Sequence, residues 1–132
     1  MPITDPIADM LTVLRNGVMV HAKEVLVKRS KVNESILEIL KKENFITTYK
    51  TVEDKKQGLL KTYLKYGKGN EAILTGLKKI SKPGRRVYVK TKEIKEVYGG
   101  IGVALISTSQ GIMTDKEAKE KRLGGEIICQ VW

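Results

Sequence analysis

A short polar tetrad with two glycines divides this chain into two halves of different character. Residues 67–70 read Gly-Lys-Gly-Asn, and such a segment can neither pack a core nor hold a helix or strand. Two amphipathic helical patterns and several strand-like runs precede it, and mainly strand-like runs follow it. The tetrad therefore predicts two small domains, residues 1–66 and residues 67–132, within a chain of 132 residues.

The first half has the pattern of an α-β-α-β-β domain. Thr4 and Asp5 offer capping side chains and Pro6 follows them, which is typical of a helix start. Apolar residues then recur at helical spacing. The expected elements are a helix over 5–20, a strand over 24–28, a helix from Ser30 to about Asn44, and two strands over 45–52 and 59–66 that form a hairpin.

The second half is predicted to be mainly β with one short helix. Thr114 and Glu117 form a capping box that begins this helix, and Gly124 and Gly125 end it after about Leu123. The other expectations are strands over 72–77, 87–90, 101–108 and 126–132, a turn over 81–84, and one helical turn over 93–98. The predicted fold class is α+β, with two small domains packed together.

Three consecutive hydroxyl side chains, Ser107, Thr108 and Ser109, follow the apolar run 103–106. Short hydroxyls at the end of a buried strand can exchange hydrogen bonds with base edges, sugars and phosphates. Alternatively, they bond the local backbone, as Ser and Thr often do in turns. A serine nucleophile would need a neighbouring base, and the only histidine, His21, lies in a polar stretch. The sequence therefore predicts no enzyme.

The charge of the chain favours a polyanionic partner. Lys and Arg outnumber Asp and Glu by 25 to 15, which gives a net charge of +10. The basic excess is densest over residues 78–95, where Arg85 and Arg86 match phosphate geometry and Tyr88 can stack on an unpaired base. The alternative is a solvated sheet edge that lysines protect against aggregation.

Two smaller groups of residues fit the same interpretation. Gly124 and Gly125 allow another backbone to come close, and Glu126 beside them can accept from base amino groups. Ser30 and Lys31 lie at the predicted start of the second helix, where backbone amides favour a phosphate. The plainer alternatives are a helix stop for the first group and a solvated charged loop for the second.

Other features of the chain narrow the range of functions. No nucleotide-binding glycine motif and no cluster with metal-ligand spacing is present, so no cofactor or metal is expected. Cys129 is the only cysteine, and we expect it to be a small buried apolar residue in the last strand. No apolar run is long enough for a membrane span, and the N-terminus lacks a signal-peptide pattern. We therefore expect a cytoplasmic protein without a membrane partner.

Several motifs, in a fixed order and spacing, carry a family resemblance. They are Asp-Pro-Ile-Ala-Asp-Met-Leu-Thr at 5–12, Arg-Asn-Gly at 15–17, Ser-Lys at 30–31, Ser-Lys-Pro-Gly-Arg-Arg-Val-Tyr at 81–88, Gly-Val-Ala-Leu-Ile-Ser-Thr-Ser-Gln-Gly-Ile-Met-Thr-Asp at 102–115, and Leu-Gly-Gly-Glu-Ile at 123–127. By these motifs the chain closely resembles the bacterial small-subunit ribosomal protein eight family over essentially its full length. One departure is Gln110, which stands where a basic residue is common.

The resemblance implies a primary binder of small-subunit ribosomal RNA that engages an irregular helix of the central domain early in assembly. It implies that this helix is approached by Ser107, Thr108, Ser109, Tyr88 and Glu126, with backbone contacts from Lys31 and the region of Thr4, Asp5 and Pro6. It also implies neighbouring small-subunit proteins as partners, a place in the ribosome, and control of the protein's own mRNA. The alternative function is a nonspecific basic module that binds RNA or DNA.

Overall fold

The computed structural model describes residues 5–132, apart from the side chain of Tyr98. The chain divides into two compact units, Met1–Thr75 and Gly76–Trp132, which we call the N-terminal and C-terminal units. Both contain helices and antiparallel strands, which confirms the predicted α+β class. The domain boundary between residues 66 and 67 stays a prediction, because compactness does not test which segment folds by itself.

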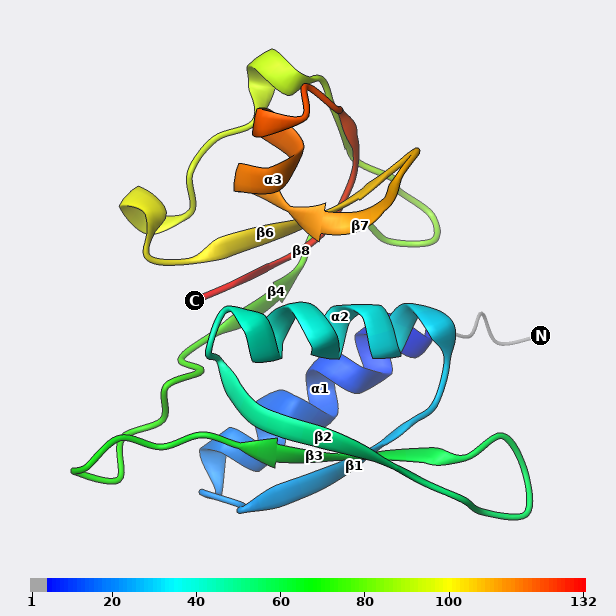
Figure 1. Cartoon of the computed structure of the whole chain (residues 1–132), viewed down its shortest axis with the longest axis vertical. Coiled ribbons are helices and arrows are strands. Elements are labelled where there is room, and N and C mark those ends of the chain that lie inside the picture. The colour runs from blue at the N-terminus through cyan, green and yellow to red at the C-terminus, as the bar shows by residue number, and fades with distance from the viewer. Residues whose placement is uncertain (1–4) are drawn as a thin grey trace. The chain divides into compact units, whose positions relative to one another are not determined.

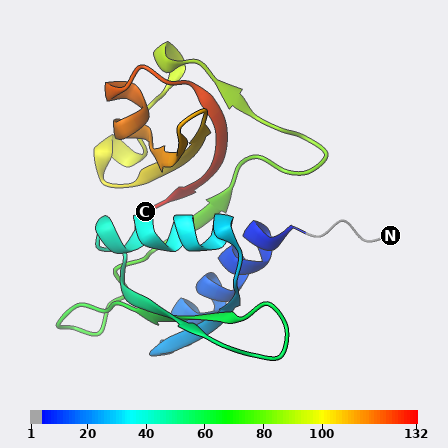
Figure 2. The same ribbon diagram turned by 45° about the vertical axis from the view of Figure 1, so that its right-hand side comes forward.

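The N-terminal unit has the predicted α-β-α-β-β order. Its elements are α1 (Pro6–Met19), β1 (Glu24–Lys28), α2 (Lys31–Lys42), β2 (Ile46–Val52) and β3 (Leu59–Leu64). The three strands form an antiparallel sheet in the order β1-β3-β2. Both helices lie on the same face of this sheet (Figures 1 and 2).

Side-chain caps fix the start of each helix, as the sequence predicts. Asp5 Oδ1 accepts a hydrogen bond from the Ala8 amide at 3.1 Å, and Ser30 Oγ accepts one from the Asn33 amide at 3.0 Å. The core lies between the helices and the inner face of the sheet. Its most buried side chains are Met10, Leu11, Leu14, Ile36, Leu37, Leu40, Ile46 and Leu60.

The C-terminal unit is mainly β. Its elements are β4 (Leu77–Lys79), β5 (Tyr88–Val89), the 3-10 turns η1 (Thr91–Glu93) and η2 (Tyr98–Gly100), β6 (Val103–Thr108), β7 (Gly111–Thr114), α3 (Asp115–Glu120) and β8 (Gly125–Val131). The strand order is β4-β8-β6-β7, and β5 also pairs with β8. Ile94, Ile106 and Met113 form a buried cluster with Ala118 of α3.

The strand predicted over residues 72–77 is wrong. Ala72 makes an isolated bridge with Tyr66, and the Ile73 amide donates to the carbonyl of Lys65 at 3.1 Å. The strand that does form, β4, begins only at Leu77 and pairs with β8. The two ends of the apolar run therefore bond to different partners, so a single strand does not form across it.

The helical turn predicted over residues 93–98 is also wrong. A 3-10 turn ends at Glu93, whose carboxylate accepts from the Lys90 amide at 2.9 Å and so closes the turn that precedes it. A second 3-10 turn begins at residue 98, and Ile94 between the two turns is buried in the core cluster. β7, a strand of 4 residues, was not predicted from the sequence.

Candidate nucleic-acid interface

Three of the predicted site residues lie in one row across neighbouring strands. Tyr88 on β5 is paired with Glu126 on β8, and Glu126 is paired with Ser107 on β6. Because paired residues in antiparallel strands project to the same face, the three side chains share one face of the sheet. Tyr88 is 68% exposed. The fold thus brings together an aromatic ring, a carboxylate and a hydroxyl that lie far apart in the sequence.

The three hydroxyl residues, which we call the hydroxyl ledge (residues 107–109), differ in their surroundings. Thr108 Oγ1 donates to the carbonyl of Gly111 at 2.8 Å and accepts from the Gln110 amide at 3.1 Å. Its hydroxyl therefore stabilises the β6–β7 turn. Ser107 is half-buried at the end of β6, whereas Ser109 is exposed at the tip of the turn. Ser109 is thus the hydroxyl best placed to meet a ligand.

A basic loop, residues 82–86, projects from the sheet next to this row. Backbone hydrogen bonds between Lys82 and Arg85, at 3.0 and 2.9 Å, close it as a tight turn. Arg85 is exposed, and Arg86 Nη1 lies 3.0 Å from Glu126 Oε2. Arg86 is thus held by the same carboxylate that sits between Tyr88 and Ser107 in the sheet.

Ser81 fixes the base of this loop. Its side chain is buried, its Oγ donates to Glu126 Oε2 at 2.7 Å, and the same Oγ accepts from the Val87 amide at 2.8 Å. One hydroxyl therefore joins the two ends of the loop and fastens them to β8. From the sequence, Ser81 is predicted only as part of a turn, and no pattern in the sequence links it to Glu126.

The carboxylate of Glu126 accepts hydrogen bonds from both Ser81 and Arg86. Burial raises its pKa, but the hydrogen bonds from Ser81 and Arg86 and the charges of Arg86 and Lys79 outweigh burial, so the pKa lies below its ordinary value. Glu126 is therefore ionised at neutral pH. Among the described residues its hydrogen bonds all involve Oε2, which leaves Oε1 available to accept from a ligand.

The glycine pair before Glu126 allows a close backbone approach within the protein itself. A Cβ at Gly124 would lie 2.5 Å from the carbonyl oxygen of Val89, and a Cβ at Gly125 would lie 2.1 Å from that of Ser107. These carbonyls belong to β5 and β6, the strands on either side of β8. The two glycines thus let the strands that carry Tyr88 and Ser107 come together around Glu126.

Two residues of the Met-Thr-Asp motif, Thr114 and Asp115, connect α3 to the strand that carries the hydroxyl ledge. Thr114 Oγ1 caps α3 by accepting from the Glu117 amide at 3.2 Å, as predicted. Asp115 is buried, and its Oδ1 accepts from the Ala104 amide of β6 at 3.3 Å. The motif therefore ties α3 to the strand that ends in the hydroxyl ledge, a role that the sequence analysis did not assign to Asp115.

The remaining predicted site residues belong to the N-terminal unit. Asp5 and Ser30 cap α1 and α2, Pro6 is the first residue of α1, and Lys31 is exposed at the start of α2. The two helix starts lie side by side at one end of the unit (Figures 1 and 2). Thr4 lies outside the described residues. Asp5, Pro6, Ser30 and Lys31 thus form a group on the N-terminal unit.

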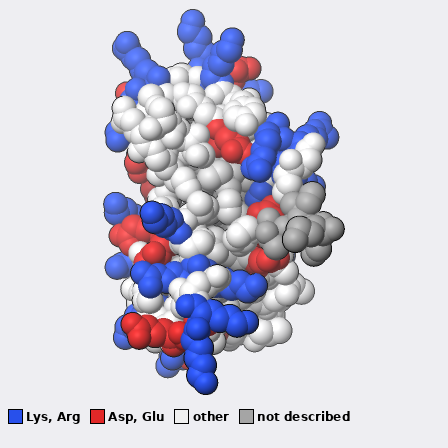
Figure 3. Space-filling model, turned by 90° about the vertical axis from the view of Figure 1, so that its right-hand side faces the viewer, with Lys and Arg blue, Asp and Glu red and all other residues white. Residues whose placement is uncertain are grey.

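Charged side chains are unevenly distributed over the surface of the C-terminal unit. In the upper part of Figure 3, which shows the C-terminal unit, Lys and Arg side chains surround an area of mostly uncharged side chains with acidic groups among them. Within residues 5–132, His, Cys, Asp and Glu form no group able to hold a metal ion. Cys129 is buried, and burial raises the pKa of its thiol to about 12. None of the described helices is long and apolar enough to span a membrane.

Comparison with known proteins gives a consistent result. The family model described as "Ribosomal protein S8" matches residues 5–132. The "Small ribosomal subunit protein uS8" of Geobacillus kaustophilus is 57% identical over 132 residues, 100% of both chains, and that of Lysinibacillus sphaericus is 55% identical over the same span. The protein of the same name from Moorella thermoacetica is 55% identical over 130 residues, 98% of this chain and 100% of its own.

Proposed function

The chain belongs to the ribosomal protein S8 family, and we propose that it binds small-subunit ribosomal RNA chiefly through the hydroxyl ledge and the residues around it. It is a structural component of the small ribosomal subunit, in which it associates with ribosomal RNA and other ribosomal proteins. It is not an enzyme.

The observation that carries the proposed site is the row of Tyr88, Glu126 and Ser107 beside the exposed Ser109. A tyrosine ring can stack on a base or a sugar. A hydroxyl both donates and accepts, and an ionised carboxylate accepts from base amino groups. The row therefore offers each type of contact that an irregular stretch of RNA presents.

The basic residues have a different role in this proposal. Arg85, exposed on the basic loop, binds a phosphate and supplies affinity that does not depend on sequence. The ledge and Tyr88 then recognise the shape of the RNA. Regular double-stranded RNA hides its base edges in a deep and narrow major groove, so the target is a distorted helix in which bases leave the stack.

The N-terminal unit contributes backbone contacts in this proposal. Exposed amides at a helix start attract phosphate, and the starts of α1 and α2 lie side by side. Asp5 and Pro6 lie at the start of α1, and Ser30 and Lys31 lie at the start of α2. The proposal also includes Thr4, which precedes Asp5 in the sequence. We assign phosphate and sugar contacts to them, with Lys31 as the charged member of the group.

Replacing Ser109 with Ala tests the ledge directly. We expect Ser109→Ala to weaken binding to small-subunit ribosomal RNA by ~1–3 kcal/mol and to leave the salt dependence of binding nearly unchanged, because it removes a hydrogen bond and no charge. Binding is measured by titration at several salt concentrations. Ser35→Ala is the matched control, because Ser35 is also exposed and its hydroxyl bonds only to the carbonyl of Lys31, at 2.9 Å.

An equal loss of affinity for ribosomal RNA and for RNA of random sequence would contradict this role of Ser109. It would favour the alternative function, a nonspecific basic module, since such a module depends on phosphate contacts alone.

Binding to the protein's own mRNA is a second part of the proposal. A message that presents the same irregular helix would occupy the same ledge. We therefore expect a fragment of the message to compete with ribosomal RNA, and Ser109→Ala to weaken both complexes by the same factor. A message that binds without displacing ribosomal RNA would exclude a shared site.

A further inference from the structure

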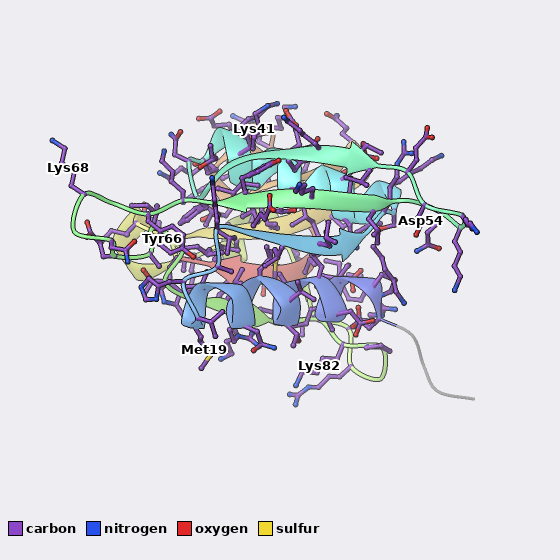
Figure 4. The ribbon with its side chains drawn as sticks, turned by 90° about the horizontal axis from the view of Figure 1, so that it is seen from below. Met19, Lys41, Asp54, Tyr66, Lys68 and Lys82 are labelled. Carbon is purple, nitrogen blue, oxygen red and sulfur yellow. The ribbon has the colours of Figure 1, made fainter. Side chains whose placement is uncertain are left out.

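The N-terminal sheet has an outer face that neither helix of its unit covers. The register places three rows of side chains on it: Glu24, Tyr63 and Thr48; Leu26, Lys61 and Lys50; and Lys28, Leu59 and Val52. All of them are exposed or half-exposed. Figure 4 looks onto these strands, and no helix of the unit crosses in front of them. We call these nine residues the outer sheet face.

A tyrosine in the first of these rows has two ammonium groups over its ring. Lys50 Nζ is 5.7 Å from the centre of the Tyr63 ring, and Lys61 Nζ is 5.9 Å from it. Tyr63 is on β3, the central strand, and the two lysines come from β2 and from β3 itself. The ring is thus a half-buried aromatic surface with two cations over it.

The charge on the outer sheet face is predominantly positive. Glu24 is its only acidic residue, and the carboxylate lies 3.5 Å from Lys61 Nζ. The ion pairs seen among residues 5–132 do not include Lys50, and Lys28 is exposed at the end of β1. Lys23 precedes the first row and is also exposed. A partner that fits this face therefore carries negative charge at several points.

Shallow hollows lie beside Tyr63 and across the face. One of about 350 Å³ is lined by Tyr63, Lys50, Thr48 and Lys23, among others. Another, of about 500 Å³, lies towards the opposite edge and is lined by Leu26, Val52, Lys61 and Glu24, with Val25. An aromatic wall, hydroxyls and lysines in one hollow suit a base with its sugar and phosphate.

From this geometry we propose that the outer sheet face binds an unpaired segment of RNA. One base stacks on Tyr63, and Lys50 and Lys61 move from their positions over the ring to the flanking phosphates. Leu26 and Val52 contact a neighbouring sugar or base. The inference rests on the proposed RNA-binding function and extends it to a second surface, which does not include the hydroxyl ledge.

Hexaadenylate RNA, which is too short to form the irregular helix that the ledge recognises, is the probe that isolates this surface. Nuclear magnetic resonance of the full chain reports which residues it contacts. We expect saturable shifts at Tyr63, Lys50 and Leu26. Tyr63→Leu should weaken binding at least about fivefold, the change that corresponds to the lower limit of base–aromatic stacking. Tyr63→Phe keeps the ring and should bind like the unmodified chain.

Charge is tested with a matched pair of lysines. Lys50→Gln should reduce the slope of log affinity against log salt by about 0.7, the value for one phosphate contact to a single strand. The control is Lys42→Gln, because Lys42 is an exposed lysine on α2 and does not belong to the outer sheet face. This variant should leave the slope unchanged.

The inference is overturned if hexaadenylate does not bind, if it shifts only residues of the C-terminal unit, or if Tyr63→Leu binds as tightly as Tyr63→Phe. Its failure is separable from that of the proposed function. Ser109→Ala is measured against small-subunit ribosomal RNA and reports on the ledge alone, whereas the Tyr63 variants are measured against hexaadenylate.

Discussion

Gly125 occupies a place where two strands of the C-terminal sheet leave no room for a side chain. A Cβ there would meet the Ser107 carbonyl oxygen at 2.1 Å, a distance that the backbone must relieve by moving. We expect Gly125→Ala to lower the free energy of unfolding by about 1–3 kcal/mol, the range for overpacking. Urea unfolding followed by circular dichroism measures this change.

Gly84 provides the control for that substitution. It lies in the basic loop, and a Cβ at this position would have no atom within 4 Å. Gly84→Ala should leave stability unchanged or raise it slightly, because alanine restricts the unfolded chain. Equal destabilisation by both substitutions would mean that loss of glycine itself, and not the close approach of β6, determines the result.

At the site, the roles of some residues could be predicted from the sequence and the roles of others could not. The pattern predicted a role for all three hydroxyls of the ledge, but it could not distinguish Thr108, which bonds within its turn, from the exposed Ser109. The difference depends on the turn geometry, which a residue type does not reveal. Nor could the pattern connect Ser81 with Glu126, because the sheet register brings them together across 45 positions.

At the scale of elements, the carboxylate of Glu126 holds the basic loop against β8. Because its pKa in the folded protein lies below the ordinary value of 4.5, ionised Glu126 stabilises the fold at pH values above 4.5. This contribution is lost as the pH falls below 4.5 and through the lowered pKa. In Glu126→Gln the titrating group is absent.

We therefore expect the difference in unfolding free energy between the unmodified chain and Glu126→Gln to be largest near neutral pH and to shrink below pH about 4.5. Chemical unfolding at a series of pH values measures it. Asp54→Asn is a useful comparison, since the pKa of Asp54 is also lowered, by hydrogen bonds from the Lys56 and Gly58 amides. A difference independent of pH would show that Glu126 acts through packing and not through its charge.

The elements that the sequence predicted well are those with long periodic patterns or clear caps. The expected strand over 24–28 matches β1 at both ends, and Asp5, Ser30 and Thr114 cap the helices as predicted. β7 was not predicted, and the strand predicted over 72–77 is wrong. Both errors arise because the formation of a short strand depends on the neighbouring strands with which it pairs. Even the first turn of α2 departs from simple apolar periodicity, because Val32 is 39% exposed and Asn33 is buried.

At the scale of the whole molecule, the net charge of +10 attracts every polyanion, so charge alone cannot explain a specific partner. Counterion release makes such attraction weaken steeply as salt increases. Hydrogen bonds and stacking at the ledge depend much less on salt. The two contributions can therefore be separated by raising the salt concentration.

We expect transfer RNA, plain duplex RNA and heparin to displace the protein from small-subunit ribosomal RNA at low salt and to lose this ability at higher salt, where the specific complex persists. Competition titrations at about 50 mM and 200 mM salt test this, because a complex held by several phosphate contacts alone loses affinity by orders of magnitude between them. Since arginine and lysine supply charge in both kinds of complex, Arg85→Ala should weaken all of them together. If heparin competes equally well at both salt concentrations, the surface recognises charge and the ledge has no part in choosing the partner.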